Sequence, residues 1–493
     1  MKKIILLLIL PLTALLAIDF TMTKEGLFTT TTQSPTSTPT STPTPSTEPE
    51  AENPYLEPVN LPKCDANNPE VQFIRSTADW SKINYSSKRI FCVSPGDYRS
   101  LGNIKLTVSG IADKRRYIVL NNENDIHPGK LAEAERFIID SMKVYGSYWI
   151  FDRMAIEHGA DYRLRLEEGA SFNIINRFYG NDIAGAIVIG HLAHNNTIQN
   201  SRFENQRDPG YDGPVAVQIM DWGVKELEVH NTKVINNEFY NQNDGFQIVR
   251  TAVDGHTKPW QDVNAEGTIL DSNLFHKDVP YMENAIDLKG GSLNPNNPVI
   301  ISNNVMWGYR KHPDYVSGSY GSGKTAILAH HDPKNIHFIN NIIFDSDEAI
   351  RAASDGPRSG FSKAFVDSII ENNVFYKCGG NGRYAIFMAS SINLHMNNNY
   401  YIKSQHDEGY IYANTGTFNN NKVALPYGGN ITFDVHPDYP NSSSFQDGMD
   451  ATQTVSNETL GDFIFTWDKF TNSPQQITLP KVMAPGHEFP KWN

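Results

Sequence analysis

The chain has 493 residues, is 39% hydrophobic and carries a formal net charge of −13 at pH 7. The apolar content is enough for a large core, and the length fits either several domains or one elongated repeat domain. The negative charge argues against nucleic acid as a partner, but it is compatible with an acidic polysaccharide held by a cation or a local basic cluster.

The N-terminal 54 residues are typical of an export signal followed by a spacer. A basic start precedes an apolar run that ends near Ala17, so residues 1–18 are predicted to be a signal peptide, with an uncleaved anchor as the alternative. Residues 19–54 are rich in Ser, Thr and Pro and have few large apolar side chains, which predicts a disordered linker. No later stretch is long and apolar enough to cross a bilayer, so we expect a secreted monomer without further membrane contact.

The chain has three cysteines, which are too few for a disulfide framework. Cys64 and Cys92 lie near the start of the folded body and could form one disulfide. Cys378 would then remain unpaired.

From about residue 70 to residue 405 the sequence repeats a two-part unit. The first part reads as an apolar residue, then Asn-Asn, then an aromatic residue. Its copies are VINNEF (234–239), ISNNVM (301–306), INNIIF (339–344), IENNVF (370–375) and MNNNYY (396–401), with weaker copies in IQNSRF (198–203) and LDSNLF (270–275). Asn at equivalent turn positions tolerates a left-handed backbone and can stack into an amide ladder.

The second part is a small residue followed by a branched apolar residue and an alternating pattern. Its copies are AIVIGH (186–191), AVQIMD (216–221), GFQIVR (245–250), AIDLKG (285–290), AILAHH (326–331), AIRAAS (349–354) and AIFMAS (385–390). Short strands that recur every roughly 20 to 30 residues plus insertions, without helical crossovers, predict a solenoid. The predicted fold is all-β, a right-handed parallel β-helix over residues 55–405 with an irregular C-terminal cap over 406–493. A β-sandwich of irregular strands is the alternative.

Equivalent strand positions stack about 4.8 Å apart in a parallel solenoid, so the second part of the repeat defines columns. Its second position is apolar in every copy and is predicted to face inward: Ile187, Val217, Phe246, Ile286, Ile327, Ile350 and Ile386. Its third and fifth positions are predicted to face outward. In the middle coils they place Gln247, Asp287, Lys289, His330 and Arg351 on one strip, with Asp244, Arg250, Glu283 and His331 at its margins.

Charged residues clustered on a rigid sheet suit a preorganised site. Lysis of a uronic-acid polysaccharide by β-elimination requires that the sugar carboxylate be neutralised and that a base remove the proton at C5. Lys289 is the predicted base, His330 and Arg351 would lower its pKa, and His330 could also act as acid or second base. Asp287 has two predicted roles, because it could bind a metal or could pair with Lys289 and raise its pKa. A plain surface ion pair of little energetic value is the alternative.

Calcium is the predicted cofactor. Its predicted ligands are Asp244, Glu283 and Asp287, and the ion would neutralise the substrate carboxylate unless Arg351 does so. The predicted partner is an acidic polysaccharide. The predicted substrate-binding residues are Gln247, Arg250, His331 and Tyr309.

The strip resembles the β-helix polysaccharide lyases of the pectate-lyase-like superfamily, and most closely the alginate lyase and chondroitinase B family. That family has a strand E-I-I-S-x-K-S with a catalytic lysine and L-R-H-G on the next coil. NAIDLKG (284–290) matches the first motif and places Lys289 on the catalytic lysine. ILAHHD (327–332) matches the second and places His330 on the family histidine, but Ala329 stands where the family has arginine. Arg351, one coil later, is the candidate to replace that arginine.

Other functions on the same fold remain open at this point. A glycoside hydrolase needs facing carboxylates, and no Asp-Asp pair occurs in the sequence; SDEAIR (346–351) is the nearest pattern. A C5-epimerase shares the proton abstraction, but HHDPKN (330–335) has the letters of the D-P-H-D signature in the wrong order. A non-catalytic adhesin or carbohydrate-binding solenoid is the remaining class.

Overall fold

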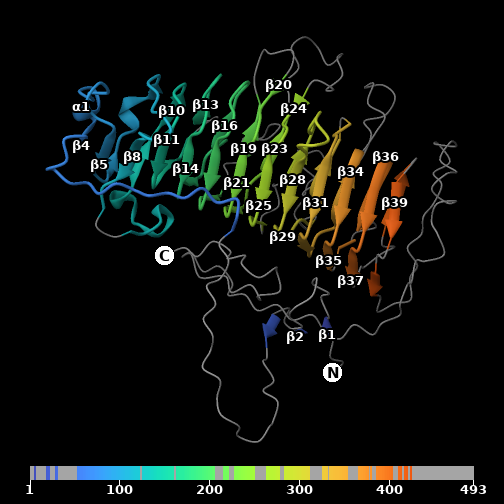
Figure 1. The fold of residues 1–493 in the computed structure, drawn as a ribbon. Coiled ribbons are helices and arrows are strands. Elements are labelled where there is room, and N and C mark those ends of the chain that lie inside the picture. The colour runs from blue at the N-terminus through green and yellow to red at the C-terminus, as the bar shows by residue number, and fades with distance from the viewer. Residues whose placement is uncertain are drawn as a thin grey trace, which may run out of the picture.

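The described part of the chain is a parallel β-helix, as predicted (Figure 1). Apart from three short N-terminal strands, the computed structural model of the chain describes residues 53–122, 125–159, 163–205, 215–220, 227–249, 263–277, 283–310, 325–330, 332–352, 365–376, 378–379, 385–402, 409–413, 416–419 and 422–424.

The three N-terminal strands, β1 (Ile5–Leu6), β2 (Ile18–Met22) and β3 (Phe28–Thr30), form a small antiparallel sheet. The remainder of residues 1–52 lies outside the described residues, so the signal peptide and the disordered linker stay predictions. In the part of the chain that the structure describes, no helix is long and apolar enough to span a membrane.

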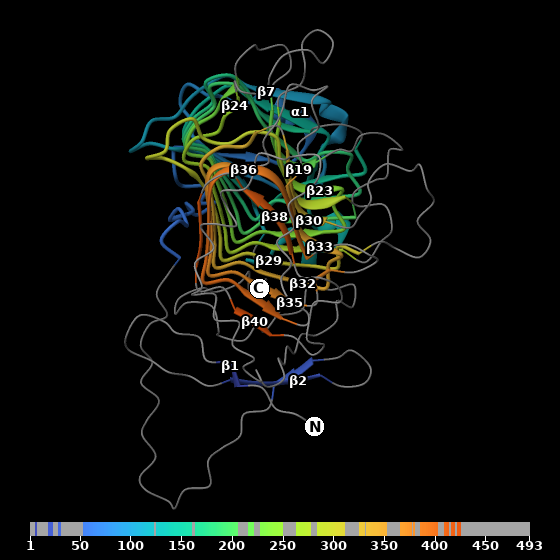
Figure 2. The same cartoon turned by 90° about the vertical axis from the view of Figure 1, so that its right-hand side faces the viewer.

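Successive coils of the solenoid contribute strands to three faces, and the strands within each face are parallel. Figure 2 shows the solenoid along its axis. The first face consists of β7 (Asn103–Leu106), β10 (Ser141–Val144), β13 (Leu164–Leu166), β16 (Ile187–Ile189), β19 (Val215–Ile219), β23 (Asp244–Ile248), β27 (Asn284–Leu288), β30 (Thr325–Ala329), β33 (Glu348–Ala352), the start of β36 (Ile386–Asn397) and β38 (Gly409–Ala413).

The second face consists of β4 (Val71–Ile74), β5 (Ile90–Val93), β8 (Arg116–Leu120), β11 (Trp149–Asp152), β14 (Ile174–Asn176), β17 (Thr197–Gln199), β21 (Lys233–Ile235), β25 (Ile269–Asp271), β28 (Val299–Ser302), β31 (Ile336–Ile339), β34 (Val366–Glu371), the end of β36 and β39 (Gly416–Asn419). Strand β36 bends from the first face into the second, so the two faces form one 23-stranded sheet.

The third face is a 12-stranded sheet. It consists of β6 (Gly96–Asp97), β9 (Phe137–Ile139), β12 (Met154–Glu157), β15 (Tyr179–Asn181), β18 (Arg202–Glu204), β22 (Glu238–Tyr240), β26 (Leu274–His276), β29 (Val305–Trp307), β32 (Ile342–Phe344), β35 (Val374–Tyr376), β37 (Tyr400–Ile402) and β40 (Lys422–Ala424).

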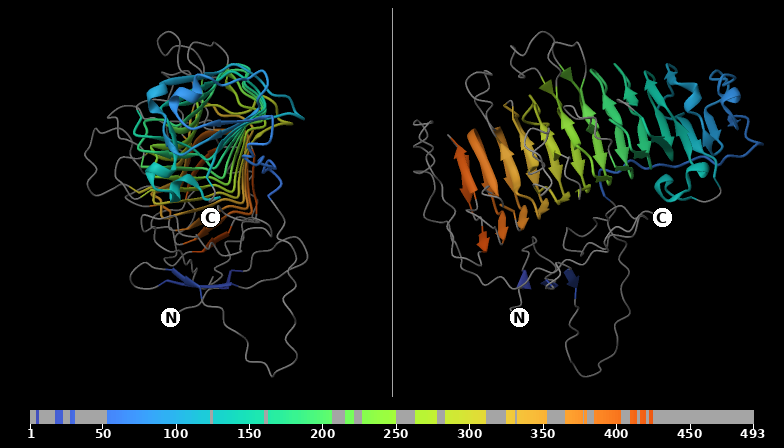
Figure 3. Two further views of the ribbon diagram at one scale, coloured as in Figure 1. Left: turned by 90° about the vertical axis from the view of Figure 1, so that its left-hand side faces the viewer. Right: turned by 180° about the vertical axis from the view of Figure 1, so that it is seen from behind.

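The remaining described elements are short and lie in turns. Helix α1 (Thr77–Trp80) and the 3-10 turns η1 (Arg99–Leu101), η2 (Pro128–Lys130) and η3 (Glu133–Glu135) belong to the first coils. Strands β20 (Leu227–Glu228) and β24 (Val263–Asn264) pair in parallel between neighbouring turns. The right-hand view in Figure 3 shows coils stacked directly on one another, and no layer of helices lies between them among the described residues, which excludes the βαβ arrangement there.

The predicted inward column of the first face is confirmed. Its seven residues are in register from coil to coil, and each is fully buried in the main core. On the third face the interior carries a stack of phenylalanines, with ring centroids 5.0 Å apart for Phe203 and Phe239 and 4.5 Å apart for Phe239 and Phe275. Apolar residues at one phase of each short strand therefore build a continuous core along the solenoid axis.

The Asn-Asn pairs form the turn between the second and third faces, and the two residues have different tasks. The first Asn has a left-handed backbone, as at Asn236 (φ 57°) and Asn340 (φ 58°). The second Asn is buried and donates from Nδ2 to the Oδ1 of the next coil at 3.0 Å. This ladder consists of Asn237, Asn273, Asn304, Asn341, Asn373 and Asn399. The predicted amide ladder is therefore confirmed.

The two ends of the solenoid differ in how they are built. At the N-terminal end Cys64 and Cys92 form the expected disulfide, and Cys378 is free and buried. At the C-terminal end β38, β39 and β40 pair in parallel with the preceding coil, so the solenoid continues beyond residue 405 to Ala424. The predicted cap over 406–493 therefore begins with a further coil, and residues 425–493 lie outside the described part.

Candidate active site

The candidate active site lies on the outer surface of the first face, in its middle coils. Backbone pairing of β23 with β27 aligns Gln247 with Asp287, and pairing of β27 with β30 aligns Asp287 with Leu328. Lys289 and His330 follow directly after β27 and β30 and lie at the next outward position of their strands. The predicted columns are thus formed, because parallel hydrogen bonding fixes the register of neighbouring coils.

Asp287 is the centre of a group of four side chains, which we call the Asp287 hub: Asp287, Gln247, Lys289 and His330. Asp287 Oδ2 lies 2.7 Å from Lys289 Nζ and accepts a hydrogen bond from Gln247 Nε2 at 2.6 Å. Its other oxygen, Oδ1, lies 3.1 Å from His330 Nε2. The Asp287 side chain is 3% exposed, whereas those of Lys289 and His330 are 21% and 17% exposed. The carboxylate is therefore covered by two groups that solvent can still reach.

The charges of the hub oppose the predicted role of Lys289 as a base. Burial alone would raise the pKa of Asp287, but Lys289 and His330 outweigh it and hold that pKa well below its ordinary value. Burial alone would lower the pKa of Lys289, but the carboxylates of Asp287 and Asp244 outweigh it, and the pKa is raised. Lys289 is therefore an ammonium ion at neutral pH. Of the two roles predicted for Asp287, the structure shows the pairing with Lys289.

Asp244, at the start of β23, is a second carboxylate of this region. Its Oδ1 accepts hydrogen bonds from the backbone and side-chain nitrogens of Asn284 at 3.2 and 3.1 Å, and its Oδ2 lies 3.4 Å from Gln247 Nε2. Burial and the nearby charges of Asp287 and Glu283 raise the pKa of Asp244 well above its ordinary value. Gln247 thus links two carboxyl groups whose pKa values are displaced in opposite directions.

The predicted calcium ligands were tested against this arrangement. Both oxygens of Asp287 and both oxygens of Asp244 already face donors of this chain. Among the described residues, no group of three or more His, Cys, Asp or Glu side chains is arranged to hold a metal ion. Glu283 lies beside them, partly exposed, in the turn before β27. The arrangement does not fit a calcium ion, and calcium stays a prediction to be tested with a chelator.

Arg351 lies on the same face as the Asp287 hub but outside it. Its position in β33 is two coils from Asp287, with Leu328 between them. Arg351 Nη1 donates to Glu348 Oε1 at 2.9 Å, and its guanidinium lies 4.9 Å from the ring centroid of Phe387. Its side chain is 31% exposed. The pKa of Lys289 is raised, so the expected lowering by Arg351 and His330 does not prevail.

The predicted substrate-binding residues differ in where the structure places them. Tyr309 is buried at 2% exposure and cannot stack on a sugar, because the turn after β29 folds it into the core cluster. Gln247 is 6% exposed and serves the hub through hydrogen bonds. Arg250 and His331 lie outside the described residues.

Sequence reasoning missed Lys277, which follows β26 and is 5% exposed. Its Nζ lies 5.6 Å from the ring centroid of Tyr309. Burial lowers the pKa of Lys277 to about 7, although the charges of Asp347 and Glu283 act in the opposite direction. Burial and the charge of Asp244 raise the pKa of Tyr309 well above its ordinary value. A lysine at the end of a strand gives no sign in the sequence that stacked turns will bury it.

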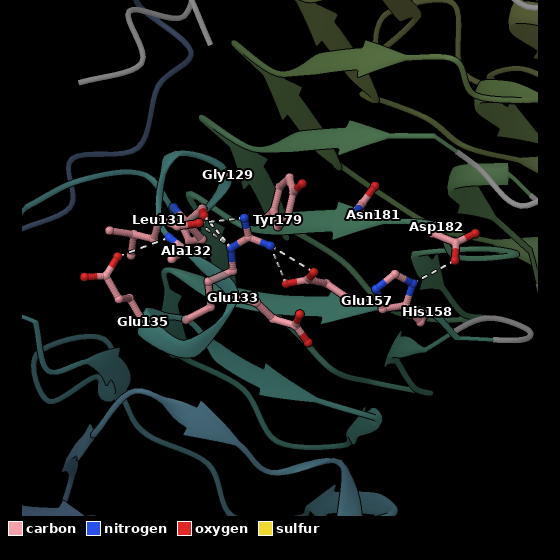
Figure 4. Close-up of polar contacts among 12 residues, drawn as sticks. Gly129, Leu131, Ala132, Glu133, Glu135, Glu157, His158, Tyr179, Asn181 and Asp182 are labelled. Atoms are coloured by element: carbon pink, nitrogen blue, oxygen red, sulfur yellow. Dashed lines mark hydrogen bonds and ion pairs between the residues drawn. The ribbon is translucent and has the colours of Figure 1, made fainter. Parts of the chain in front are cut away.

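A second group of paired charges lies on the third face, near its N-terminal end. Figure 4 shows Glu157 and Tyr179 there, and His158 beside Asp182 at 2.7 Å. Arg136 Nη1 donates to both oxygens of Glu157 at 2.9 Å, and its guanidinium lies 4.7 Å from the Tyr179 ring. Arg136 also donates to the carbonyl oxygens of Pro128 and Leu131, so it ties the segment of η2 and η3 to the sheet, and we assign this group a structural role rather than a reaction.

Comparisons with known proteins give likenesses of structure alone. No known protein-family model matches the chain, and no curated protein matches it. One similar solved structure is a mannuronic acid-specific polysaccharide family 6 lyase from human gut microbiota, at 13% identity and a TM-score of 0.49, covering 76% of this chain and 84% of that one. An alginate lyase from Paenibacillus sp. str. FPU-7 has 13% identity and a TM-score of 0.40, covering 62% and 96%. The PL6 family alginate lyase AlyGC has 12% identity and a TM-score of 0.47, covering 81% and 60%. Structural similarity at such low sequence identity and TM-score says nothing about the reaction, so any inference about function depends on the residues of the site.

Proposed function

We propose that this chain is a polysaccharide lyase that cleaves a uronic-acid-containing polymer by β-elimination on the outer surface of the first face. The observation that carries the proposal is the Asp287 hub, which presents an ammonium ion and an imidazole on one rigid sheet. In the β-helix, the backbone hydrogen bonds between β23, β27 and β30 hold these groups in place before a substrate arrives.

The hub suggests a division of roles that differs from the one predicted from the sequence. Lys289 stays charged because Asp287 lies 2.7 Å away, so it suits neutralisation of the sugar carboxylate better than removal of the C5 proton. His330 suits the base, because an ionised Asp287 keeps the imidazole proton on Nε2 and leaves Nδ1 as the basic nitrogen. In the elimination the C5 proton passes to His330, the C4–C5 double bond forms and the C4–O bond breaks. The imidazolium can then return the proton to the leaving oxygen.

Incubation with a panel of uronate polymers tests the proposal. A lyase forms an unsaturated end that raises absorbance in the near ultraviolet, and both Lys289→Ala and His330→Ala should abolish that rise while the fold is retained. The division of roles is tested by Lys289→Arg, which keeps the positive charge and should keep part of the turnover if Lys289 acts as a cation. Loss equal to that of Lys289→Ala would restore Lys289 as the base. Parallel assays with a chelator test the predicted calcium ion.

Glycoside hydrolysis is the second candidate, because one observation favours it. Asp244 and Asp287 are linked through Gln247, and their pKa values are displaced in opposite directions. A protonated and an ionised carboxyl group close together are the pair that an acid–base hydrolysis requires. Both are nearly inaccessible in this arrangement, at 1% and 2% exposure, which makes elimination the better-supported function. Release of reducing ends without near-ultraviolet absorbance would identify a hydrolase.

A further inference from the structure

A column of three cations crosses the first coils of the first face. Register pairs Lys143 of β10 with Lys105 of β7 on one side and with Arg165 of β13 on the other. The same outward column continues coil by coil through Val188 to Asp287. Strands β10, β13, β16 and β19 follow one another in this order in Figure 1. The cation column and the candidate active site are therefore parts of one sheet surface.

The column has more positive than negative charge. Glu167 forms ion pairs with both Lys143, at 3.5 Å, and Arg165, at 3.1 Å. Lys105 is exposed and has no ion pair with any described residue. Like charges directly opposite one another on neighbouring strands destabilise a sheet, so a column of three stacked cations is a cost to the fold.

Nearby charges do not cancel this excess. Arg163 at the start of β13 pairs with Asp140 at 3.0 Å, which makes that pair neutral. Glu168 is exposed in the turn beyond the column. Tyr145, directly after β10, is 41% exposed and adds an aromatic ring beside the cations. An exposed ring next to cationic side chains is suited to an anionic sugar chain, because the ring stacks on the sugar and the cations pair with its carboxylates.

We propose that Lys105, Lys143, Arg165 and Tyr145 form a secondary binding site for an anionic polysaccharide, the cation patch. The choice of a uronate polymer as the ligand of this patch rests on the proposed function. With coils about 4.8 Å apart, the patch lies about 19 to 29 Å from Asp287 along the solenoid axis. Val188 and Gln218, on coils between the two, are buried, so the patch is separate from the active site. A polymer long enough to reach both sites is bound twice, and the second contact is intramolecular.

Affinity for polymers of two lengths tests the patch. The variant is Lys105→Gln/Lys143→Gln/Arg165→Gln, because glutamine keeps the aliphatic stem and removes the charge. The matched control is Lys63→Gln/Lys82→Gln/Lys114→Gln, which removes the same charge at exposed positions outside the first face. Both are made in the His330→Ala chain, so that no turnover disturbs binding while Lys289 is kept, and thermal unfolding checks that each is folded. The probes are long alginate, an alginate trisaccharide, a neutral glucan and single-stranded DNA.

We expect the patch variant to bind long alginate about tenfold or more weakly than the control variant, with the trisaccharide and the glucan unaffected. The difference should shrink as salt is raised, because exposed charges are screened. Equal affinity of the two variants for long alginate overturns the patch. So does binding of DNA by the patch as tightly as alginate, which would assign it to polyanions of another class.

The outcome is separable from that of the proposed function. Patch-dependent binding of alginate without any unsaturated product from the native chain would support the patch and contradict the lyase. Unsaturated product together with equal binding by both variants would support the lyase and contradict the patch. Tyr145→Ala, which leaves every charge in place, should weaken binding of long alginate independently of salt, and an unchanged affinity would remove the ring from the patch.

Discussion

Replacement of Asp287 by Asn removes the negative charge of the Asp287 hub and nearly keeps the shape of the side chain. Breaking a fully buried ion pair costs about 3–5 kcal/mol, whereas an exposed pair contributes less than about 1 kcal/mol. Lys289 and His330 lie between these limits, at 21% and 17% side-chain exposure. We therefore expect Asp287→Asn to lower the free energy of unfolding by about 2 kcal/mol at pH 7.

The sign of the pH dependence follows from the displaced pKa. Asp287 has a lowered pKa in the folded chain, so its contribution is present in full above the ordinary carboxyl pKa of about 3.9 and is lost as the pH falls toward the folded value. The contribution of the Asp287 charge should thus persist from pH 7 down to about pH 5 and shrink progressively below that.

Denaturant unfolding at a series of pH values measures this difference. Gln247→Leu is a matched control, because it removes a neutral partner of Asp287 without removing charge. Its effect should not change between pH 5 and neutral pH. A stability difference for Asp287→Asn below about 0.5 kcal/mol at pH 7, or one that does not shrink below about pH 5, would show that the carboxylate is not held ionised by its two partners.

Three further predictions concern the site and the solenoid. His330→Ala should lower kcat by about 10² to 10⁴ on any substrate that the native chain cleaves, and equal kcat values would remove His330 from proton transfer. Asn304→Ala should lower the free energy of unfolding by about 3 kcal/mol, since it removes the Nδ2 donor to the Leu270 carbonyl and to Asn341 Oδ1 and the Oδ1 acceptor of the two Asn273 amides; a change below about 1 kcal/mol in denaturant unfolding would contradict the ladder as a source of stability. The pKa of Lys277 is lowered to about 7, so the unfolded chain binds the extra proton and stability should rise with pH between about 7 and 10. Lys277→Met should flatten that rise, and an identical pH profile in both chains would show that Lys277 is not buried as described.

The register of the coils could be predicted because it depends on local sequence. The apolar position represented by Ile286 recurs in every copy, and only one phase of a short strand can face a core. The Asn-Asn turn was recognisable for the same reason, since both its left-handed residue and its ladder residue are set by the turn itself. Which residues share the surface with Lys289 followed directly from this register.

The contacts within the site could not be predicted, because they depend on how far side chains reach and on what covers them. Asp287 and His330 are 43 residues apart, and their contact requires the imidazole to turn back across one coil. The link between Asp244 and Asp287 passes through Gln247, whose Nε2 faces both carboxyl groups while its Oε1 accepts from Gln218. Tyr309 and Lys277 are buried by stacked turns of unequal length, and no periodicity of the sequence reports that.

The position of Lys289 explains why one residue pair can be both a stabilising contact and part of a site. Asp287 supplies the negative charge that keeps Lys289 protonated when no substrate is present. In the proposed reaction, a uronate carboxylate at Lys289 carries the same charge, so it can share the ammonium with Asp287 without a change in protonation. Lys289 needs only a small movement for this exchange, because its side chain is already partly exposed and its backbone is fixed by the Lys289 N–H bond to Ile248 O at 2.9 Å. The cost of reorganisation on binding is then small, which is the condition under which a charged group on a rigid sheet accelerates a reaction.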